Sequence, residues 1–161
     1  MKRSLTAFVI ACLTLLAAGA QAQNEPPPST GQTLYLPIHT SIAQGDLDKS
    51  GKPRETPLAI HASLRNTDPR QPVKILSIRH FDPQGRPVRE LLAAPQVVPP
   101  LGSHQVVVPR ADAPGGSAAS LLILWTADVP VNPLLAEGLH ADSRDGRAAV
   151  FITTALPIRA R

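Results

Sequence analysis

The chain contains one cysteine and one methionine among its 161 residues. The cysteine is Cys12, inside an apolar N-terminal run, so no intrachain disulfide can form. Once that run is removed, the protein has no thiol chemistry. Sites that carry copper favour soft sulfur ligands, and these are missing as well. Without a disulfide, we expect burial of the core alone to hold the fold together.

Aromatic residues are also scarce, at 3% of the chain. Of the 16 Lys and Arg residues, Lys2 and Arg3 lie in the N-terminal run, and the rest nearly balance the 12 Asp and Glu residues. These basic residues are scattered rather than clustered. Nucleic-acid binding needs a basic stripe or aromatic side chains that stack on bases. The sequence therefore predicts no nucleic-acid partner.

The N-terminus has the pattern of a secretory signal peptide over residues 1–22. Lys2 and Arg3 precede an uncharged apolar run that ends at Ala20, and Ala20-Gln21-Ala22 forms a cleavage signal of small residues. The run is too short for a stable membrane span, and no later stretch is long and apolar enough for one. An uncleaved anchor and lipidation of Cys12 are the alternatives. We expect a periplasmic protein with no transmembrane segment after processing.

Residues 23–32 form a polar, proline-rich leader, and residues 33–158 have the length of one domain. All 18 prolines lie from Pro26 onward, which leaves little room for helices. The stretch that organises the domain runs from Leu58 to Asp82. Two alternating runs, 58–65 and 72–81, flank a break at residues 66–69, and we expect them to be neighbouring strands.

Further strands are indicated over residues 33–41, 88–92, 103–109, 120–127, 134–141 and 147–156. Pro37 places the first of these at a sheet edge, since proline cannot donate to a strand ladder. Residues 43–57 and 128–133 are predicted loops, Asp82-Pro83-Gln84-Gly85 a type I turn, and residues 142–146 the turn of a hairpin. The apolar run 120–127 predicts a central strand with Trp125 in the core.

Seven or eight short strands without a sustained helical period predict an all-β fold. The pattern is typical of an immunoglobulin-like antiparallel β-sandwich, with a small β-barrel as the alternative.

One acidic loop has the start of a calcium-binding motif. Asp46, Asp48 and Ser50 stand at positions 1, 3 and 5, with glycine at position 6. Position 12 is Pro57 rather than the glutamate that supplies two oxygens. The loop is therefore interpreted either as an acidic turn between strands or as a calcium site. No other cofactor is indicated.

Catalytic patterns are incomplete. The histidines, His39, His61, His80, His104 and His140, show no metal-ligand spacing. We expect His61 to face solvent and His80 to pack in a partly buried position. Residues 115–119 lack the second glycine of a serine hydrolase elbow, and no pair of carboxylates can be argued for glycoside hydrolysis. No catalytic residue is predicted.

Several motifs resemble a bacterial family of exported proteins of unknown function, the domain-of-unknown-function family 3124. They are Ser63-Leu64-Arg65-Asn66-Thr67-Asp68, Asp82 and Gly85, and Gly115-Gly116-Ser117 followed by Trp125, with Leu36-Pro37 and Gly45-Asp46 also matching. The resemblance spans roughly residues 34–158. The chain departs from it at Ala118, Leu124, His39 and His80. The departures at the histidines argue against shared catalytic groups. The resemblance implies an exported protein of this fold, and no activity.

The sequence thus predicts a non-catalytic module that binds another protein of the envelope or plays a structural role there. We expect the binding surface at the first strand or at loops 43–57 and 110–117, because edges and end loops of small sandwiches are open to partners. A protein that binds a small ligand or calcium through residues 43–57 is the first alternative. An uncharacterised enzyme is the second.

Overall fold

The computed structural model describes residues 26–111, 115–144 and 147–159. The predicted signal peptide, with Cys12, lies outside the described residues. The described chain is antiparallel β-structure with one short 3-10 turn, η1 (Gly116–Ala118). Among these residues, no helix has the length and apolar character needed to cross a membrane.

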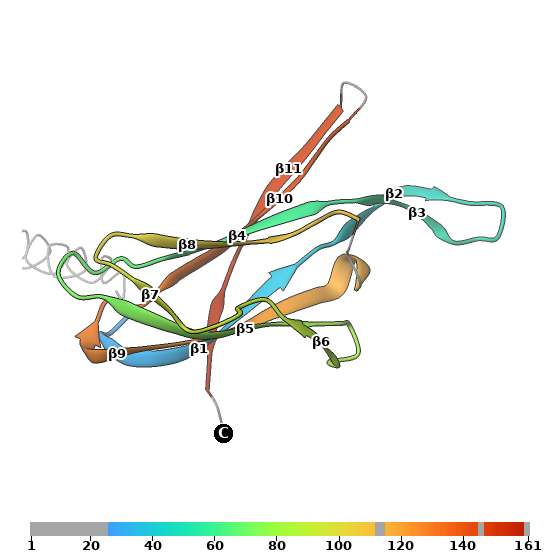
Figure 1. The fold of residues 1–161 in the computed structure, drawn as a ribbon. Helices are drawn as coiled ribbons and strands as arrows, with labels where there is room; N and C mark the ends of the chain where they lie inside the picture. The colour runs from blue at the N-terminus through green and yellow to red at the C-terminus, as the bar shows by residue number, and fades with distance from the viewer. Residues whose placement is uncertain (1–25, 112–114, 145–146, 160–161) are drawn as a thin grey trace, which may run out of the picture.

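Two large sheets stack on each other, and a small hairpin projects from them (Figure 1). The six-stranded sheet has the order β12 (Leu156–Ile158), β1 (Ser29–Ile38), β9 (Ala119–Val131), β5 (Val73–Phe81) and β6 (Pro87–Glu90), with β7 (Gln96–Val98) also paired to β5. The four-stranded sheet has the order β11 (Arg147–Thr154), β10 (Leu135–Arg144), β4 (Ala59–Arg65) and β8 (Ser103–Val108). The hairpin consists of β2 (Ser41–Leu47) and β3 (Pro53–Pro57).

The predicted β-sandwich is confirmed, and the sheets are open rather than closed into the alternative barrel. The described residues form twelve strands, more than the seven or eight expected. The additional strands, among them β2, β3 and β7, lie in polar or proline-containing segments that sequence patterns assign to loops. Pairing with another strand of the protein, rather than their own composition, keeps these segments extended: β2 pairs with β3, and β7 pairs with β5.

The core lies between the two large sheets and follows the alternation of side chains along each strand. Leu34, Leu36 and Ile38 of β1 point inward, as do Ile60, Ala62 and Leu64 of β4 and Leu121, Ile123 and Trp125 of β9. Trp125 is only 1% exposed, which confirms its predicted place in the core. Strand β9 lies between β1 and β5, so its predicted central position is also confirmed. It continues to Val131, through most of the predicted loop 128–133.

The expectation that 58–65 and 72–81 are neighbouring strands is wrong. Strand β4 belongs to the four-stranded sheet and β5 to the six-stranded one. The segment 66–72 crosses from one layer to the other. Alternation along each strand shows which residues face the core, but both sheets share that core, so alternation cannot tell which sheet a strand joins.

The prediction of an edge position for the first strand is also wrong, since β1 lies between β12 and β9. Strand β12 pairs only with residues 33–35 of β1. Pro37 lies beyond that pairing, where β9 flanks β1 on one side only. Proline is tolerated at such a position because the open side needs no backbone donor.

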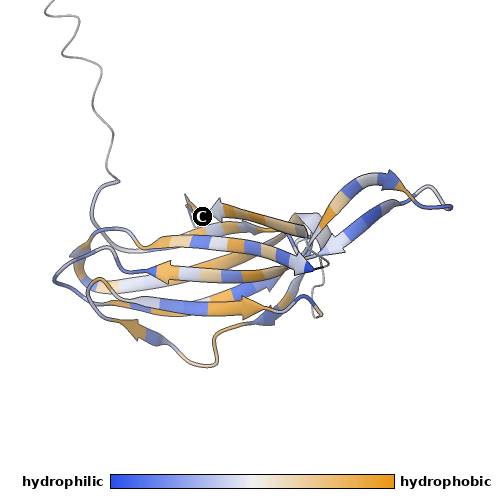
Figure 2. Cartoon of the chain, turned by 90° about the horizontal axis from the view of Figure 1, so that it is seen from above, coloured by the Kyte–Doolittle hydropathy of each residue, from blue (hydrophilic) through white to orange (hydrophobic). Residues whose placement is uncertain are grey.

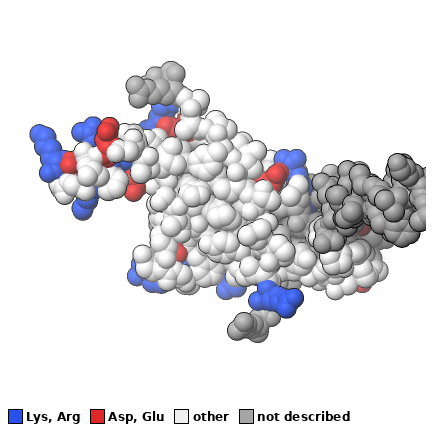
Figure 3. All heavy atoms as spheres, turned by 180° about the vertical axis from the view of Figure 1, so that it is seen from behind, with Lys and Arg blue, Asp and Glu red and all other residues white. Residues whose placement is uncertain are grey.

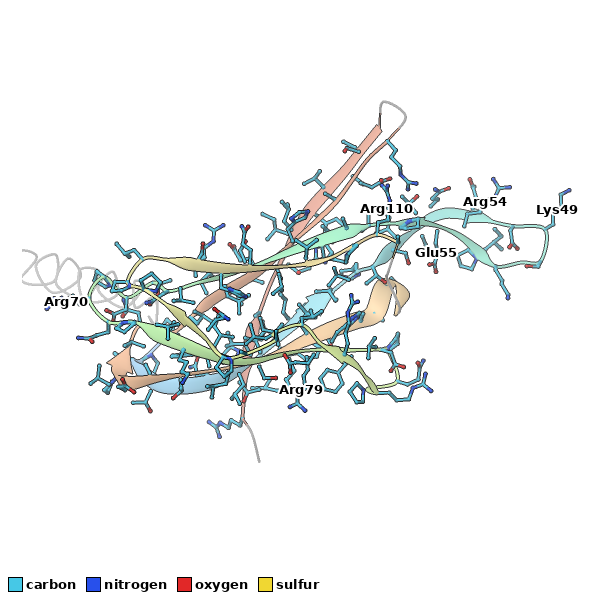
Figure 4. All side chains as sticks on the ribbon, viewed as in Figure 1. Lys49, Arg54, Glu55, Arg70, Arg79 and Arg110 are labelled. Atoms are coloured by element: carbon cyan, nitrogen blue, oxygen red, sulfur yellow. The ribbon has the colours of Figure 1, made fainter. Side chains whose placement is uncertain are left out.

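The predicted loop 43–57 is a projecting β-hairpin, named here the hairpin arm and defined as residues 41–57 (Figures 1 and 2). Residues 43–55 are exposed throughout, so the arm contributes little to the core. It bears many charged side chains, of which Lys49, Arg54 and Glu55 are labelled in Figure 4. Antiparallel pairing of Ser41 with Pro57 closes its base.

One predicted turn is present. In the link between β5 and β6, the Gly85 N–H donates to the Asp82 carbonyl at 2.9 Å, the bond expected between the first and fourth residues of such a turn. The predicted hairpin after residue 134 is formed by β10 and β11. Its predicted turn, 142–146, is too long, because residues 142–144 pair with β11 and belong to β10, and residues 145–146 lie outside the described residues.

Candidate functional site

The last two strands of the chain form one edge of each large sheet, on the same side of the sandwich. Strand β11 ends the four-stranded sheet, and after Ala155 the chain continues into β12, which ends the six-stranded sheet. Among the described strands, β11 pairs only with β10, and β12 only with β1. We call residues 147–158 the C-terminal edge ribbon. It places one continuous segment along both layers.

The outer side of β11 carries backbone groups that no strand in the described part of the chain pairs with. The Ala155 N–H donates to the Ala136 carbonyl at 2.9 Å. Antiparallel pairs alternate between hydrogen-bonded and non-hydrogen-bonded ones. In the register of β10 with β11, the odd-numbered residues of β11 therefore bond to β10. The N–H and C=O groups of the even-numbered residues point away from it: Ala148, Val150, Ile152 and Thr154.

Three of these four even-numbered residues, Ala148, Val150 and Ile152, present apolar side chains to solvent. Val150 and Ile152 are each 61% exposed. Ile152 lies opposite Leu139, Leu139 opposite His61, and His61 opposite Val107, so one row of side chains crosses the outer face of the sheet. Leu156 and Ile158 continue the exposed apolar series along β12. The ribbon thus combines open backbone groups with exposed branched side chains.

After Arg147, the ribbon also lacks the charges that usually protect an edge strand. Residues 148–158 contain no Asp, Glu, Lys or Arg. Figure 3 shows a largely uncharged surface on the back of the molecule. By contrast, β6 at the other edge of the six-stranded sheet contains Pro87, Arg89 and Glu90. Charges, prolines and bulges normally prevent edge strands from pairing with other chains, and β11 has neither proline nor charge after position 147.

The inner side of the ribbon is anchored to the sandwich. The Thr153 hydroxyl donates to the Pro37 carbonyl at 2.8 Å. The Phe151 ring stacks on the His140 ring with 4.5 Å between centroids, and His39 meets both rings edge-on. These contacts hold β11 in place, so its outer edge is presented on a fixed support.

His140 is a buried, neutral histidine. Its Nε2 accepts the His39 N–H at 3.0 Å, so in the hydrogen-bond network the ring proton is assigned to Nδ1. Burial lowers the pKa of His140, and the neighbouring His39 lowers it further. The role of this ring is therefore to pack and to accept a hydrogen bond, since burial and His39 both oppose its protonated form.

A second surface feature is a cleft of about 780 Å³ between the hairpin arm and the β10–β11 hairpin. Its walls include Ile42, Gln44, Asp46 and Thr56 from the arm and Asp142 and Arg144 from the hairpin. We call it the arm cleft. It is open and polar, and the residues described as lining it include no serine or cysteine nucleophile beside a histidine.

Asp142 in the arm cleft is paired with two arginines. It accepts from Arg144 Nε at 2.7 Å and from Arg110 Nη1 at 2.8 Å. The hydrogen bond from Arg144 is the main cause that lowers its pKa, and Arg110 adds to the effect. Asp142 is therefore a charged partner of two arginines and not a proton donor near neutral pH.

The three predicted calcium ligands lie on the hairpin arm. Asp46 is in β2 and lines the arm cleft, whereas Asp48 and Ser50 are in the turn beyond it. Asp48 Oδ1 accepts hydrogen bonds from Ser50 N, Ser50 Oγ and Lys52 N at 2.7–2.9 Å, and these bonds lower its pKa. Over the described residues, no three His, Cys, Asp or Glu side chains cluster as metal ligands. The calcium interpretation stays a prediction.

The Asn-Thr-Asp part of the longest motif forms a cluster of hydrogen bonds, named here the Asn66 cluster. It lies at the end of the sandwich opposite the arm, where Arg70 is labelled in Figure 4. Asn66 is 2% exposed, and its side-chain amide donates to the carbonyls of Gln71, Val98 and Pro99 at 2.8–3.3 Å. Asp68 accepts from the backbone of Arg70 and Gln71 through Oδ1, and from Asn132 through Oδ2. These hydrogen bonds join three chain segments, at residues 66–71, 98–99 and 132, so this motif serves the fold.

The remaining residues considered from the sequence, two histidines and the Gly-Gly-Ser segment, lie in positions that serve the fold or face solvent. His61 is exposed as expected, whereas His80 is fully buried rather than partly so. Ser117 is an exposed residue of η1. Gly116 has a φ of 57°, and its carbonyl accepts from the backbone N–H and the hydroxyl of Thr40. The glycine pair therefore serves a tight turn that holds the start of the arm.

Sequence patterns predicted the strand at residues 147–156 but not its role as an open edge. The available signal was the uncharged stretch 148–158. An uncharged stretch indicates an open edge only when its strand is known to lie at the end of a sheet, as β11 does. The contact between His39 and His140 was also missed, because it joins residues 101 positions apart.

Neither the curated proteins nor the solved structures contain a significant match to this chain. A family model described as "Protein of unknown function (DUF3124)" matches residues 31–158. This range includes the Asn66 cluster, the core strands and the C-terminal edge ribbon. The chain therefore belongs to the DUF3124 family.

Proposed function

We propose that the protein is an exported, non-catalytic β-sandwich that works as a protein-interaction module in the bacterial envelope. The observation that supports this most directly is the outer side of β11, with open backbone groups, exposed Val150 and Ile152, and no charge over residues 148–158. The module would recognise another protein by accepting an added β-strand along this edge, a common mode of recognition in which main-chain hydrogen bonds supply affinity.

The periplasmic location in the proposal rests on the N-terminal pattern. Basic residues, a short apolar run and the Ala20-Gln21-Ala22 exit are typical of a cleaved secretory signal. The proposal of a non-catalytic role rests on the surroundings of the polar groups. Asp142 is paired with arginines, Asp48 closes a turn and His140 packs against Phe151.

Photo-crosslinking in the periplasm tests the proposed binding edge. A photoreactive residue replaces Ile152 on the ribbon or, in the matched control, Val107 on the opposite edge of the same sheet. Both side chains are exposed and lie on the same outer face. We expect a discrete protein adduct from position 152 and none of that size from position 107. Equal adducts from both positions, or none from position 152, would refute the proposed edge.

Small-ligand binding in the arm cleft is a second candidate, favoured by the cleft of about 780 Å³ and by the Asp46 side chain in its wall. Replacement of arm residues 43–55 by a two-residue turn removes one wall of the arm cleft and leaves the ribbon in place. If the module acts through this cleft, the shortened protein loses its function while position 152 still gives its adduct.

A further inference from the structure

We infer that the strand added to β11 is β11 of a second copy of this chain, so that the protein is a two-fold symmetric dimer. The inference rests on the proposed function and names the partner at that edge. The two four-stranded sheets would join into one continuous antiparallel sheet. In such a dimer the same patch of both copies meets, and it must therefore be complementary to itself.

The backbone of β11 meets this condition in one register. The residues whose N–H and C=O groups point outward are Ala148, Val150, Ile152 and Thr154. These four positions are centred on Phe151. An antiparallel arrangement with Phe151 on the two-fold axis places each outward residue opposite another outward residue, 148 against 154 and 150 against 152. This register uses all the open groups of both copies, and any shift leaves some of them unpaired.

The side chains fit the same register. Val150 of one copy lies opposite Ile152 of the other, and both pairs share the outer face of the sheet. Cross-strand pairs of β-branched residues stabilise antiparallel sheets. The exposed row that runs through Leu139 to Ile152 would continue into the row of the second copy, and each Val150–Ile152 pair would cover part of its own apolar surface.

Charge favours a second copy over a partner selected electrostatically. Residues 148–154 contain no charge, so no like charges oppose each other within the paired segment. For the same reason, the edge offers no charged group that would select an acidic or basic peptide. An uncharged strand with alternate apolar side chains fits this edge, and β11 itself is such a strand.

The first test is the mass of the exported protein in solution, measured by light scattering after size exclusion over a range of concentrations. We expect wild type to show twice the monomer mass at the upper concentrations. Val150→Pro removes an outward N–H without removing a bond to β10, so it should yield a folded monomer. Ile152→Lys should do the same through its charge. The matched control Val107→Lys should remain dimeric.

Folding of each variant is checked by circular dichroism and by its unfolding midpoint. If Val150→Pro does not fold, Ile152→Lys decides the test, because that side chain is exposed and its replacement leaves the core unchanged.

The second test examines the register in a Cys12→Ser background. Val150→Cys and Ile152→Cys proteins are mixed under oxidising conditions. Opposed residues of a hydrogen-bonded pair lie about 5.5 Å apart between Cα atoms, within the range of a disulfide. Two copies of the same variant are offset by about two residues along the strand, which exceeds that range. We therefore expect a disulfide-linked dimer between the two variants and none with either variant alone.

The outcomes separate the inference from the proposed function. A wild-type protein that stays monomeric at all concentrations, or a dimer that survives both Val150→Pro and Ile152→Lys, overturns the inference. If the protein is monomeric but position 152 still gives an adduct with a different protein in the periplasm, the proposed edge stands and only its occupant changes. If position 152 gives no adduct either, both fail.

Discussion

The backbone N–H of His39 donates a 3.0 Å hydrogen bond to Nε2 of His140, which lies 101 positions later in the chain. This bond joins the end of β1 to β10 directly beneath the C-terminal edge ribbon, where Phe151 stacks on the His140 ring. Since Nε2 accepts the bond, protonation of His140 would break it. The contacts that hold the ribbon against the sandwich therefore depend on His140 being uncharged.

Folding stability should fall as pH decreases below the normal pKa of histidine. Burial lowers the pKa of His140 in the folded state from its usual value of 6.5. Its contribution is fully present above that value and is lost as pH falls towards the folded pKa, because the unfolded chain takes up the proton first. The slope from one such group reaches at most about 1.4 kcal/mol per pH unit.

Urea unfolding between pH 7 and pH 5 measures this slope. His140→Gln cannot take up the proton and should flatten it, whereas the exposed control His61→Gln should leave it unchanged. A wild-type stability that is constant over this range would contradict the assignment of His140 as buried and neutral.

Trp125→Ala should be one of the most damaging single substitutions. The ring is 1% exposed in the core, between the two large sheets. Replacement of a buried tryptophan by alanine costs about 3–5 kcal/mol, a large part of the roughly 5–15 kcal/mol that stabilises a domain. Chemical unfolding followed by circular dichroism measures the loss. The exposed Leu124→Ala on the same strand is the control, and an equal loss in both variants would contradict the placement of Trp125.

Asn66→Ala should destabilise the fold by about 1–3 kcal/mol, because it removes the donor of a buried hydrogen bond to the Val98 carbonyl and of partly buried ones to the Gln71 and Pro99 carbonyls. Asn66→Asp removes the same amide donor while keeping the size of the side chain and should be similarly unfavourable. Asn132→Ala, which loses one exposed bond to the Thr67 carbonyl, is the control. Equal midpoints for Asn66→Ala and wild type in urea would show that the Asn66 cluster does not stabilise this end of the sandwich.

Calcium should leave the unfolding midpoint unchanged. Asp48 Oδ1 already accepts three hydrogen bonds from its own turn, and Pro57 occupies the position of the ligand that normally supplies two oxygens. Thermal unfolding after chelation and then with added calcium measures the response. A rise of the midpoint with calcium that Asp46→Ala abolishes would support the calcium interpretation instead.

Shortening of the hairpin arm should change stability little. Residues 43–55 are exposed, and the buried residue at the base, Ser41, loses only the hydrogen bond from its hydroxyl to Glu55, which is worth about 1 kcal/mol. A variant with a two-residue turn in place of 43–55 should unfold at nearly the wild-type midpoint in a thermal scan. A large drop would mean that the arm supports the sandwich.

Local patterns identified most of the longer strands and the turn at residues 82–85, but missed β2, β3 and β7. The continuous apolar run 120–127 correctly placed Trp125 in the core, and Asp82 with Gly85 correctly marked a turn. Pro37 was misleading because a strand's edge status can change along its length, and β12 covers only part of β1. The arm was assigned to a loop because polar, exposed residues carry no burial signal even when they pair.

The sequence by itself determined the fold class, the family, the core side of most strands and the neutral character of residues 148–158. These properties follow from side-chain chemistry at short spacing along the chain. Only the tertiary structure decided that β4 and β5 lie in different layers, that His39 meets His140, and that β11 and β12 border both sheets. Pairing between strands depends on which distant segments share a core and a register, and open edges exist only once all strands have been placed.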